Sequence, residues 1–236
     1  MMTAAAFFLA VALQGQPEGG DSPRTRTIGD LPLRFERVTF VFAPTLSLDW
    51  DVDIDFSVGG NSYEVGELSE GKSIFGGGIG LDLGCLDLTA ILDATRSLQG
   101  SGAQTAPSPA AADFEGKLVL GRLVGGLRVF GFEWGPPSGP PTVEVWLRPT
   151  LELTWAELVL QEATSTLGTS IFRENERGVA WGAGLSVAAR FRIDSALLGL
   201  ELGWLFAGGR LSGALEIDDR RELWVGLTLS LLPVSD

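Results

Sequence analysis

One segment of the chain, residues 38–58, alternates between apolar and polar side chains without a break. Apolar residues or proline occupy every second position from Val38 to Val58, and most positions between them hold Thr, Ser or Asp. Successive residues of a β-strand point to opposite faces, so the pattern predicts one long strand with an apolar and an acidic face. Strands of soluble domains rarely exceed about ten residues. A strand this long and this two-faced is typical of a barrel wall between lipid and a polar lumen.

Seven further segments have the composition and alternation of strands. They span residues 73–84, 86–95, 114–134, 142–160, 178–193, 196–207 and 222–232. The polar stretches 59–72, 97–113, 161–177 and 208–221 are expected to form long loops, the second of them mobile, while short turns are expected near Gly84, at 135–141 and at Asp194–Ser195. The face assignment within 114–134 stays open, because Gly125–Gly126 could hold a bulge.

Long and short connections therefore alternate along the predicted strands. This rhythm predicts an all-β fold, an eight-stranded antiparallel up-and-down transmembrane β-barrel. Between Val38 and Leu232 the chain resembles the small eight-stranded bacterial outer-membrane barrels of the outer-membrane protein A and X types. The resemblance rests on pattern and implies location in the outer membrane of a double-membraned bacterium, with short turns in the periplasm and long loops outside.

Alternation by itself does not tell which face of the ring is inside. A soluble lipocalin-like barrel would have the apolar face inside, and a membrane barrel inverts this. Two features favour the membrane barrel. The polar face is rich in small residues such as Gly76, Gly78 and Gly182, and the apolar face is rich in Leu, Trp and Phe. Lys72 and Lys117 are the only lysines, which is unusual for a soluble surface.

The composition excludes several kinds of function. The chain has no His and a single Cys, so it offers neither a Ser-His or Cys-His catalytic pair nor a multi-cysteine metal site. A net charge of -13 argues against nucleic-acid binding. We therefore predict no enzymatic activity, no cofactor and no metal.

The polar face carries charged residues that are predicted to pair inside the barrel, because buried carboxylates without partners are costly. The predicted lumen charge network consists of Asp49, Asp51, Asp53, Asp55, Asp82, Arg148, Arg190, Arg192 and Glu201, and Arg122 and Arg128 are possible further members. Three alternatives remain open for the four aspartates at 49–55. They could bind Ca²⁺, form a pair of catalytic carboxylates as in glycoside hydrolysis, or lie solvated above the membrane.

Large apolar residues on the other face are expected to meet lipid or its interfaces. The predicted lipid-facing or girdle residues are Trp50, Phe56, Trp155, Trp181, Phe191, Trp204 and Phe206. Pro44–Trp50 and Pro149–Trp155 also share a sequence pattern, which is explained either by an internal repeat on opposite walls of the ring or by convergence of similar strands on similar motifs.

The N-terminal region divides into two parts ahead of the barrel. Residues 1–16 contain a short apolar run with an A-x-A-like site, typical of a signal peptide, and 17–33 form a polar, loose leader before a barrel at 34–236. We expect a monomer that contacts outer-membrane lipid, and envelope or extracellular ligands through its loops. The predicted function is structural or surface interaction with a plugged lumen, and the alternative is a narrow channel or hydrophobic-ligand conduit.

Overall fold

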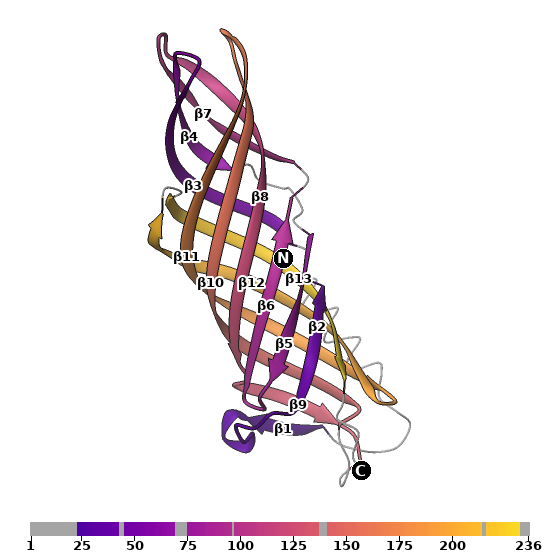
Figure 1. Ribbon diagram of the computed structural model, residues 1–236. Helices are drawn as coiled ribbons and strands as arrows, with labels where there is room; N and C mark the ends of the chain where they lie inside the picture. Colours follow the sequence, from indigo (N-terminus) through magenta and orange to yellow (C-terminus); the bar gives the residue numbers. More distant parts are fainter. Residues whose placement is uncertain are drawn as a thin grey trace.

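The computed structural model describes residues 23–42, 45–68, 75–95, 97–136, 141–213 and 216–231, and almost all of them lie in antiparallel strands (Figure 1). The strands are β1 (Arg24–Thr27), β2 (Arg37–Phe42), β3 (Thr45–Val58), β4 (Asn61–Leu68), β5 (Phe75–Asp82), β6 (Leu86–Ala94), β7 (Leu98–Ala106), β8 (Ala110–Leu127), β9 (Phe130–Trp134), β10 (Val143–Ser165), β11 (Gly168–Ile193), β12 (Ala196–Gly213) and β13 (Glu216–Leu231). A short 3-10 helix, η1, spans Ile28–Asp30. Among the described residues, no helix has the length and apolar character needed to cross a membrane.

Eight strands pair in a ring at the lower level of the molecule. The order is β2, β5, β6, β8, β10, β11, β12 and β13, and β13 pairs again with β2. Neighbouring strands in this ring follow one another along the chain once β3, β4, β7 and β9 are set aside. The ring is therefore the expected antiparallel up-and-down barrel with eight strands.

Above the ring, the wall of the barrel continues through different strands. The upper part of β13 pairs with β3, which pairs with β4, which pairs with β7, and β7 pairs with the upper part of β8. The single long strand expected over residues 38–58 is thus two strands, β2 followed by β3, and residues 43–44 between them lie outside the described part. Figure 1 shows the strands β3, β4, β7, β8, β10 and β11 rising above the hairpin of β12 and β13.

The long loops expected on this side are mostly strands, which corrects the sequence prediction. Residues 161–177 continue β10 and β11 to a turn at Thr166–Leu167, and 98–106 form β7 where a mobile loop was expected. Within 59–72, β3 and β4 are joined by Gly59 and Gly60, whose φ values of 58° and 84° are typical of a tight hairpin turn. Most of 208–221 likewise belongs to β12 and β13. The strands in these segments were not recognised from the sequence, because small and charged residues stand in them where large apolar residues mark the other strands.

In residues 114–134 the strand changes face, but it does so after the glycine pair Gly125–Gly126 and not at it. The pairing of β8 with β6 and β10 runs through Gly125 and Gly126 without a register shift. The buried positions change parity instead after β8, at Arg128–Phe130, where the strand breaks and β9 begins.

The described part of the polar leader forms a strand and a 3-10 helix, where a loose segment was expected. Strand β1 pairs with β9 at the lower end of the barrel, and Thr27 and Asp30 cap η1 through the 2.7 Å bond from the Thr27 amide to the Asp30 carboxylate. This bond holds the pKa of Asp30 below its usual value. The chain then crosses the lower mouth, where the Arg34 and Glu36 amides donate to the carbonyls of Leu83 and Asp82. The expected signal peptide, residues 1–16, lies outside the described residues.

Small residues are required where two strands approach closely at the inner wall. A Cβ atom added to Gly78 in β5 would lie 2.0 Å from the carbonyl oxygen of Ala90 in β6. We expect Gly78→Ala to destabilise the refolded barrel by about 1–3 kcal/mol, since backbone must move to accommodate the methyl group. Gly66→Ala in β4 is the matched control, because no atom lies within 4 Å of the added carbon. Urea unfolding followed by Trp fluorescence measures both, and equal stabilities would contradict the steric account.

Candidate functional site: a charged lumen beneath an apolar extension

The wall of the lower ring is inverted relative to a soluble protein. Large apolar side chains are exposed on its outside and charged or hydroxyl side chains are buried inside. The exposed set includes Phe40, Ile79, Leu81, Leu92, Leu123, Leu151, Leu153, Leu198, Leu227 and Leu231. A contiguous apolar belt around a polar interior is the arrangement of a lipid-embedded barrel. The structure is accordingly that of an outer-membrane barrel, with the short turns at Gly84 and Asp194 at its lower end.

A first group of charges, which we call the lumen cluster, is centred on Asp82. Its Oδ2 atom accepts from Arg37 Nε at 2.5 Å, from Arg190 Nη1 at 3.1 Å and from Arg128. Arg37 also contacts Glu144 at 3.3 Å. Asp82 is 1% exposed and comes from β5, while the arginines come from β2, the segment after β8, and β11. One buried carboxylate therefore joins three parts of the wall.

The lumen cluster continues upward through Asp87 and Arg148. Asp87 accepts from Arg128 Nη2 at 2.9 Å and lies 3.0 Å from Arg148 Nε. Arg148 in turn contacts Glu201, which also accepts from the Ser186 hydroxyl at 2.6 Å. Beside these groups is a small cavity of about 20 Å³, lined by Asp87, Arg148 and Glu201 among others. That volume is enough for about one water molecule.

A second group, the Arg122 cluster, lies higher in the lumen. Arg122 is 2.5 Å from Asp93 Oδ2, 3.3 Å from Glu222 and 3.8 Å from Glu152. All four side chains are buried. The Thr154 hydroxyl donates to Glu152 at 2.5 Å. One cation thus faces three carboxylates from three different strands.

The predicted charge network divides into four sets. Asp82, Arg148, Arg190 and Glu201 lie inside the barrel as members of the lumen cluster. Asp55 is exposed, and Val52 and Ile54, whose parity is opposite to that of Asp55, are buried, so this part of the prediction is corrected. Arg192 donates to the Asp194 carbonyl at the lower turn and is no member of either cluster. The side chains of Asp49, Asp51 and Asp53 lie outside the described part.

Sequence reasoning missed several members of the two clusters. These are Arg37, Asp87, Asp93, Glu144, Glu152 and Glu222, and the structure also assigns the possible members Arg122 and Arg128 to the inside. Most of them occupy the polar parity of their strands, which is the signal that could have identified them. Arg128 was ambiguous, because it lies at the break between β8 and β9.

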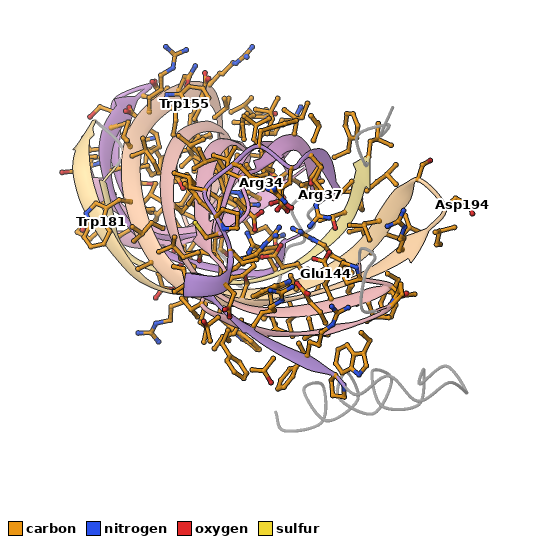
Figure 2. All side chains as sticks on the ribbon, turned by 90° about the horizontal axis from the view of Figure 1, so that it is seen from below. Arg34, Arg37, Glu144, Trp155, Trp181 and Asp194 are labelled. Carbon is orange, nitrogen blue, oxygen red and sulfur yellow. The ribbon has the colours of Figure 1, made fainter. Side chains whose placement is uncertain are left out.

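The predicted girdle residues also fall into different places. Trp155, Trp181 and Phe191 are exposed on the outer wall, Trp204 is half-buried there, and Figure 2 shows Trp155 and Trp181 at the rim of the ring. Phe56 is corrected: it packs on the inside against Tyr63, Phe114 and Phe172. The side chains of Trp50 and Phe206 lie outside the described part.

Above the Arg122 cluster the wall reverses its polarity. We call this upper part, formed by β3, β4, β7 and the upper segments of β8, β10 and β11, the extension. Its interior is an apolar core of Val52, Ile54, Tyr63, Val65, Leu98, Ala112, Phe114, Leu118, Leu120, Ala156, Leu158, Leu160, Ala163, Phe172 and Ala180. Its outer surface carries Asp55, Glu64, Glu67, Asp113 and Glu115, with Lys117, Arg173 and Arg177 as the described basic residues. Apolar inside and charged outside is the arrangement of a protein surrounded by water.

Aromatic side chains at the top of the extension join β11 to the paired strands β3 and β4, with which β11 itself does not pair. Phe56 of β3 and Phe172 of β11 have ring centroids 5.0 Å apart, and the Tyr63 hydroxyl of β4 is 2.7 Å from the Ser170 hydroxyl of β11. These contacts tie β11 to β3 and β4 through side chains.

Two carboxylates interrupt the apolar inner face of β11. Glu174 and Glu176 have the same parity as the buried residues Phe172 and Gly178, and they pair in register with the core residues Leu160 and Leu158. Both are half-buried. Burial, and then the charge of Glu174, raises the pKa of Glu176 above its usual value.

The lower mouth of the lumen is covered by the described part of the leader and the residues that follow it. A cavity of about 300 Å³ lies between this segment and the lumen cluster, lined by Arg26, Arg34, Arg37, Arg128, Asp30, Glu36, Glu133 and Glu144, with Leu31, Pro32 and Pro141. Figure 2, which looks into this end, shows Arg34, Arg37 and Glu144 near the centre of the ring. The positive and negative side chains here are balanced, and the arginines contact Glu36, Glu133 or Glu144. Burial raises the pKa of Glu36. Among the described residues, no group of three or more acidic, Cys or His side chains is arranged to hold a metal ion.

No family model matches the sequence, and no curated protein sequence matches it either. Solved structures with a similar course of the chain include Neisserial surface protein A, at 8% identity, covering 82% of this chain and 96% of that one with a TM-score of 0.37. They also include Ail, the attachment invasion locus protein of Yersinia pestis, in complex with the heparin analogue sucrose octasulfate, at 13% identity, 84% and 98% coverage and a TM-score of 0.34. The outer membrane protein OprG from Pseudomonas aeruginosa has 10% identity, 85% and 95% coverage and a TM-score of 0.33.

Proposed function

We propose that this eight-stranded outer-membrane barrel has a structural or surface-interaction role, exerted through its extension, and that the charge clusters close its lumen to solutes. The observation that carries the proposal is the reversal of wall polarity above Arg122. A wall with a core of its own and a charged outer surface is built to stand in water beyond the lipid belt. The extension is therefore the part of the molecule that meets the cell's surroundings.

The charge of the extension indicates what kind of partner suits it. Its outer face carries Asp55, Glu64, Glu67, Asp113 and Glu115, and few basic side chains lie among them in the described part. Such a surface repels polyanions and attracts positively charged partners, more strongly at low ionic strength. We expect partners with basic segments rather than sulfated polysaccharides or nucleic acids.

Thiol labelling of intact cells tests the orientation on which the role depends. In a Cys85→Ser background, Ile171→Cys at the tip of the extension should react with a membrane-impermeant maleimide on whole cells. Ser195→Cys, at the turn of the opposite end, is the matched control and should react only after the outer membrane is permeabilised. If Ser195→Cys reacted on intact cells and Ile171→Cys only after permeabilisation, an outward-facing extension would be excluded. The same holds if neither variant reacted in the folded protein.

The alternative function is a narrow channel or hydrophobic-ligand conduit, and conductance separates it from the closed lumen. An eight-stranded ring is wide enough only for side chains to fill it. Two features support closure: the lumen cluster spans the ring from β2 to β12, and the apolar core of the extension lies above it.

The wild-type barrel should show no steady openings in a planar lipid bilayer. Arg148→Ala combined with Arg190→Ala should produce openings, because two long side chains leave the centre of the lumen. Leu151→Ala combined with Leu153→Ala on the outer wall serves as the control and should stay closed. Steady openings of the wild-type protein would favour the channel instead. We further propose that the barrel is monomeric and carries out no catalysis.

A further inference from the structure

Two strands of the extension end the sheet with an unpaired edge. Strand β11 pairs with β10 along its whole length, but its pairing with β12 covers only Gly178 to Ile193. Strand β3 pairs with β4 up to Val58, but its pairing with β13 ends at Asp53. In the part of the chain that the structure describes, no strand therefore pairs with 168–177 of β11 or 54–58 of β3 on their second sides. Unpaired edges are templates for the addition of another strand.

The short hairpin of β12 and β13 is the cause of both edges. Strand β12 ends at Gly213 and β13 begins at Glu216, while β11 and β3 continue upward on either side (Figure 1). The edge segment of β11 is long enough for strand addition, because strands of about five or six residues are usual in folded proteins.

The inner side of the β11 edge carries a charge that the extension itself does not neutralise. Glu174 and Glu176 lie on the inner face of β11, beside the apolar pair Leu158 and Leu160 of β10. Neither carboxylate has a hydrogen bond or an ion pair with another described residue. The basic residues nearby in sequence point the other way, since Arg177 and Asn175 both donate to Glu157 on the outer face, at 3.1 and 2.6 Å.

We propose that the free edge of β11 binds an extended, basic segment of another protein, which adds to the sheet as an antiparallel strand. The inference rests on the proposed surface-interaction role and names its partner class. Main-chain hydrogen bonds to residues 169–177 hold the segment, and its inward side chains select it. The residues opposite Glu176 and Glu174 are basic, because opposite charges directly across a strand pair attract. The residue opposite Phe172 is apolar.

The antiparallel direction fixes the order of these residues. A segment running opposite to β11 meets Glu176 first, then Glu174, then Phe172. Because inward side chains alternate along a strand, the motif read from its N-terminus is basic, any, basic, any, apolar. A parallel segment would require the reverse order, so the sequence of the partner reports the direction of pairing.

A synthetic peptide with the core Lys-Thr-Lys-Thr-Leu tests the proposal on the full barrel in lipid nanodiscs. Fluorescence anisotropy of the labelled peptide should show saturable binding that weakens with salt. Glu174→Gln combined with Glu176→Gln should weaken it by about five- to thirty-fold, the effect of losing two cross-strand charge pairs. Glu64→Gln combined with Glu67→Gln is the matched control, because it removes the same charge from the outer face of β4, and it should change affinity little.

Three further peptides keep the test decisive if the double variant folds poorly. A peptide with Gln for Lys should bind wild-type protein more weakly, a peptide of reversed sequence should bind more weakly, and one with N-methylated backbone amides should not bind. Equal binding by the N-methylated peptide would indicate simple surface charge attraction and overturn strand addition. Absence of binding by the Lys-Thr-Lys-Thr-Leu peptide overturns the proposal.

Three other outcomes are also informative. Light scattering that shows a dimer dissociated by Glu174→Gln and Glu176→Gln would mean that a second copy fills the edge, and would overturn the proposal of a foreign partner. If the peptide did not bind but Ile171→Cys were labelled on intact cells as expected, only the proposed edge site would be rejected. Failure of that labelling on intact cells would instead reject the proposed surface role.

Discussion

Replacing Asp82 by asparagine should lower the free energy of unfolding of the refolded barrel by about 3–5 kcal/mol, the cost of removing one partner from a buried ion-pair network. The Asp82 carboxylate accepts from Arg37, Arg128 and Arg190, and it is 1% exposed. The amide removes the negative charge while keeping the shape, so three guanidinium groups remain buried with less compensation. Equilibrium unfolding in urea, with the protein in detergent micelles, measures the change.

Asp55→Asn is the matched control for this substitution. It makes the same chemical change on the exposed face of β3, where solvent screens the charge, and it should alter stability by less than about 0.5 kcal/mol. If Asp82→Asn were as mild as Asp55→Asn, the lumen cluster would contribute nothing to the stability of the wall. Arg190→Ala should destabilise in the same direction, since it removes a partner of Asp82 from the opposite side.

Replacing Phe114 by alanine should destabilise the barrel by about 3–5 kcal/mol, the range for truncating a fully buried aromatic ring. Phe114 is 0% exposed and lies in the core of the extension, where its ring meets Phe56 and Tyr63 at centroid distances of 6.1 and 6.0 Å. The expected effect is large because the extension is packed. An extension of loosely held loops would lose little, since few contacts would be removed.

Ile171→Ala is the control for the core substitution. Ile171 is 86% exposed on β11, next to the buried Phe172, so its side chain has little apolar contact to lose. Hydrogen exchange adds a second readout: Phe114→Ala should increase amide exchange in β4 and β7, while the lower ring stays protected. Uniform exchange throughout both levels would show that the two levels unfold as one unit.

The two substitutions examine opposite interiors in one continuous wall. Below the Arg122 cluster, lipid is outside and charge is inside. Above it, charge is outside and hydrocarbon is inside. The strands β8, β10 and β11 pass through both levels, so each of them changes which parity is apolar. In β8, Leu118 and Leu120 are buried in the core, and two residues further on Arg122 is buried at the same parity among carboxylates.

The alternation in the lower ring was read correctly from the sequence because it depends only on local chemistry. Residues such as Leu198 and Leu227 alternate with small or polar ones, and any barrel in lipid needs that order. The short turn at Asp194–Ser195 was equally local, and the structure has it there. The closed lumen and the surface role stay predictions.

The extension could not be assigned from the sequence, because both interiors produce the same alternation. Thr45 to Val58 reads as apolar and acidic whichever face turns inward, so Asp55 was assigned to the lumen and Phe56 to the lipid. The level of the strand relative to the membrane decides the matter, and that level depends on pairing with β13 and β4. The partners of Asp82 likewise come from positions up to 108 residues away.

The sequence by itself determined that this chain forms strands, that they alternate in polarity and that they close an eight-stranded barrel, since period and turn chemistry are properties of neighbouring residues. Only the tertiary structure decided where the wall leaves the lipid, which charges meet in the lumen and which edges remain unpaired. Those outcomes depend on the register between strands that are distant in the sequence, and the sequence of a single strand does not determine its register with another.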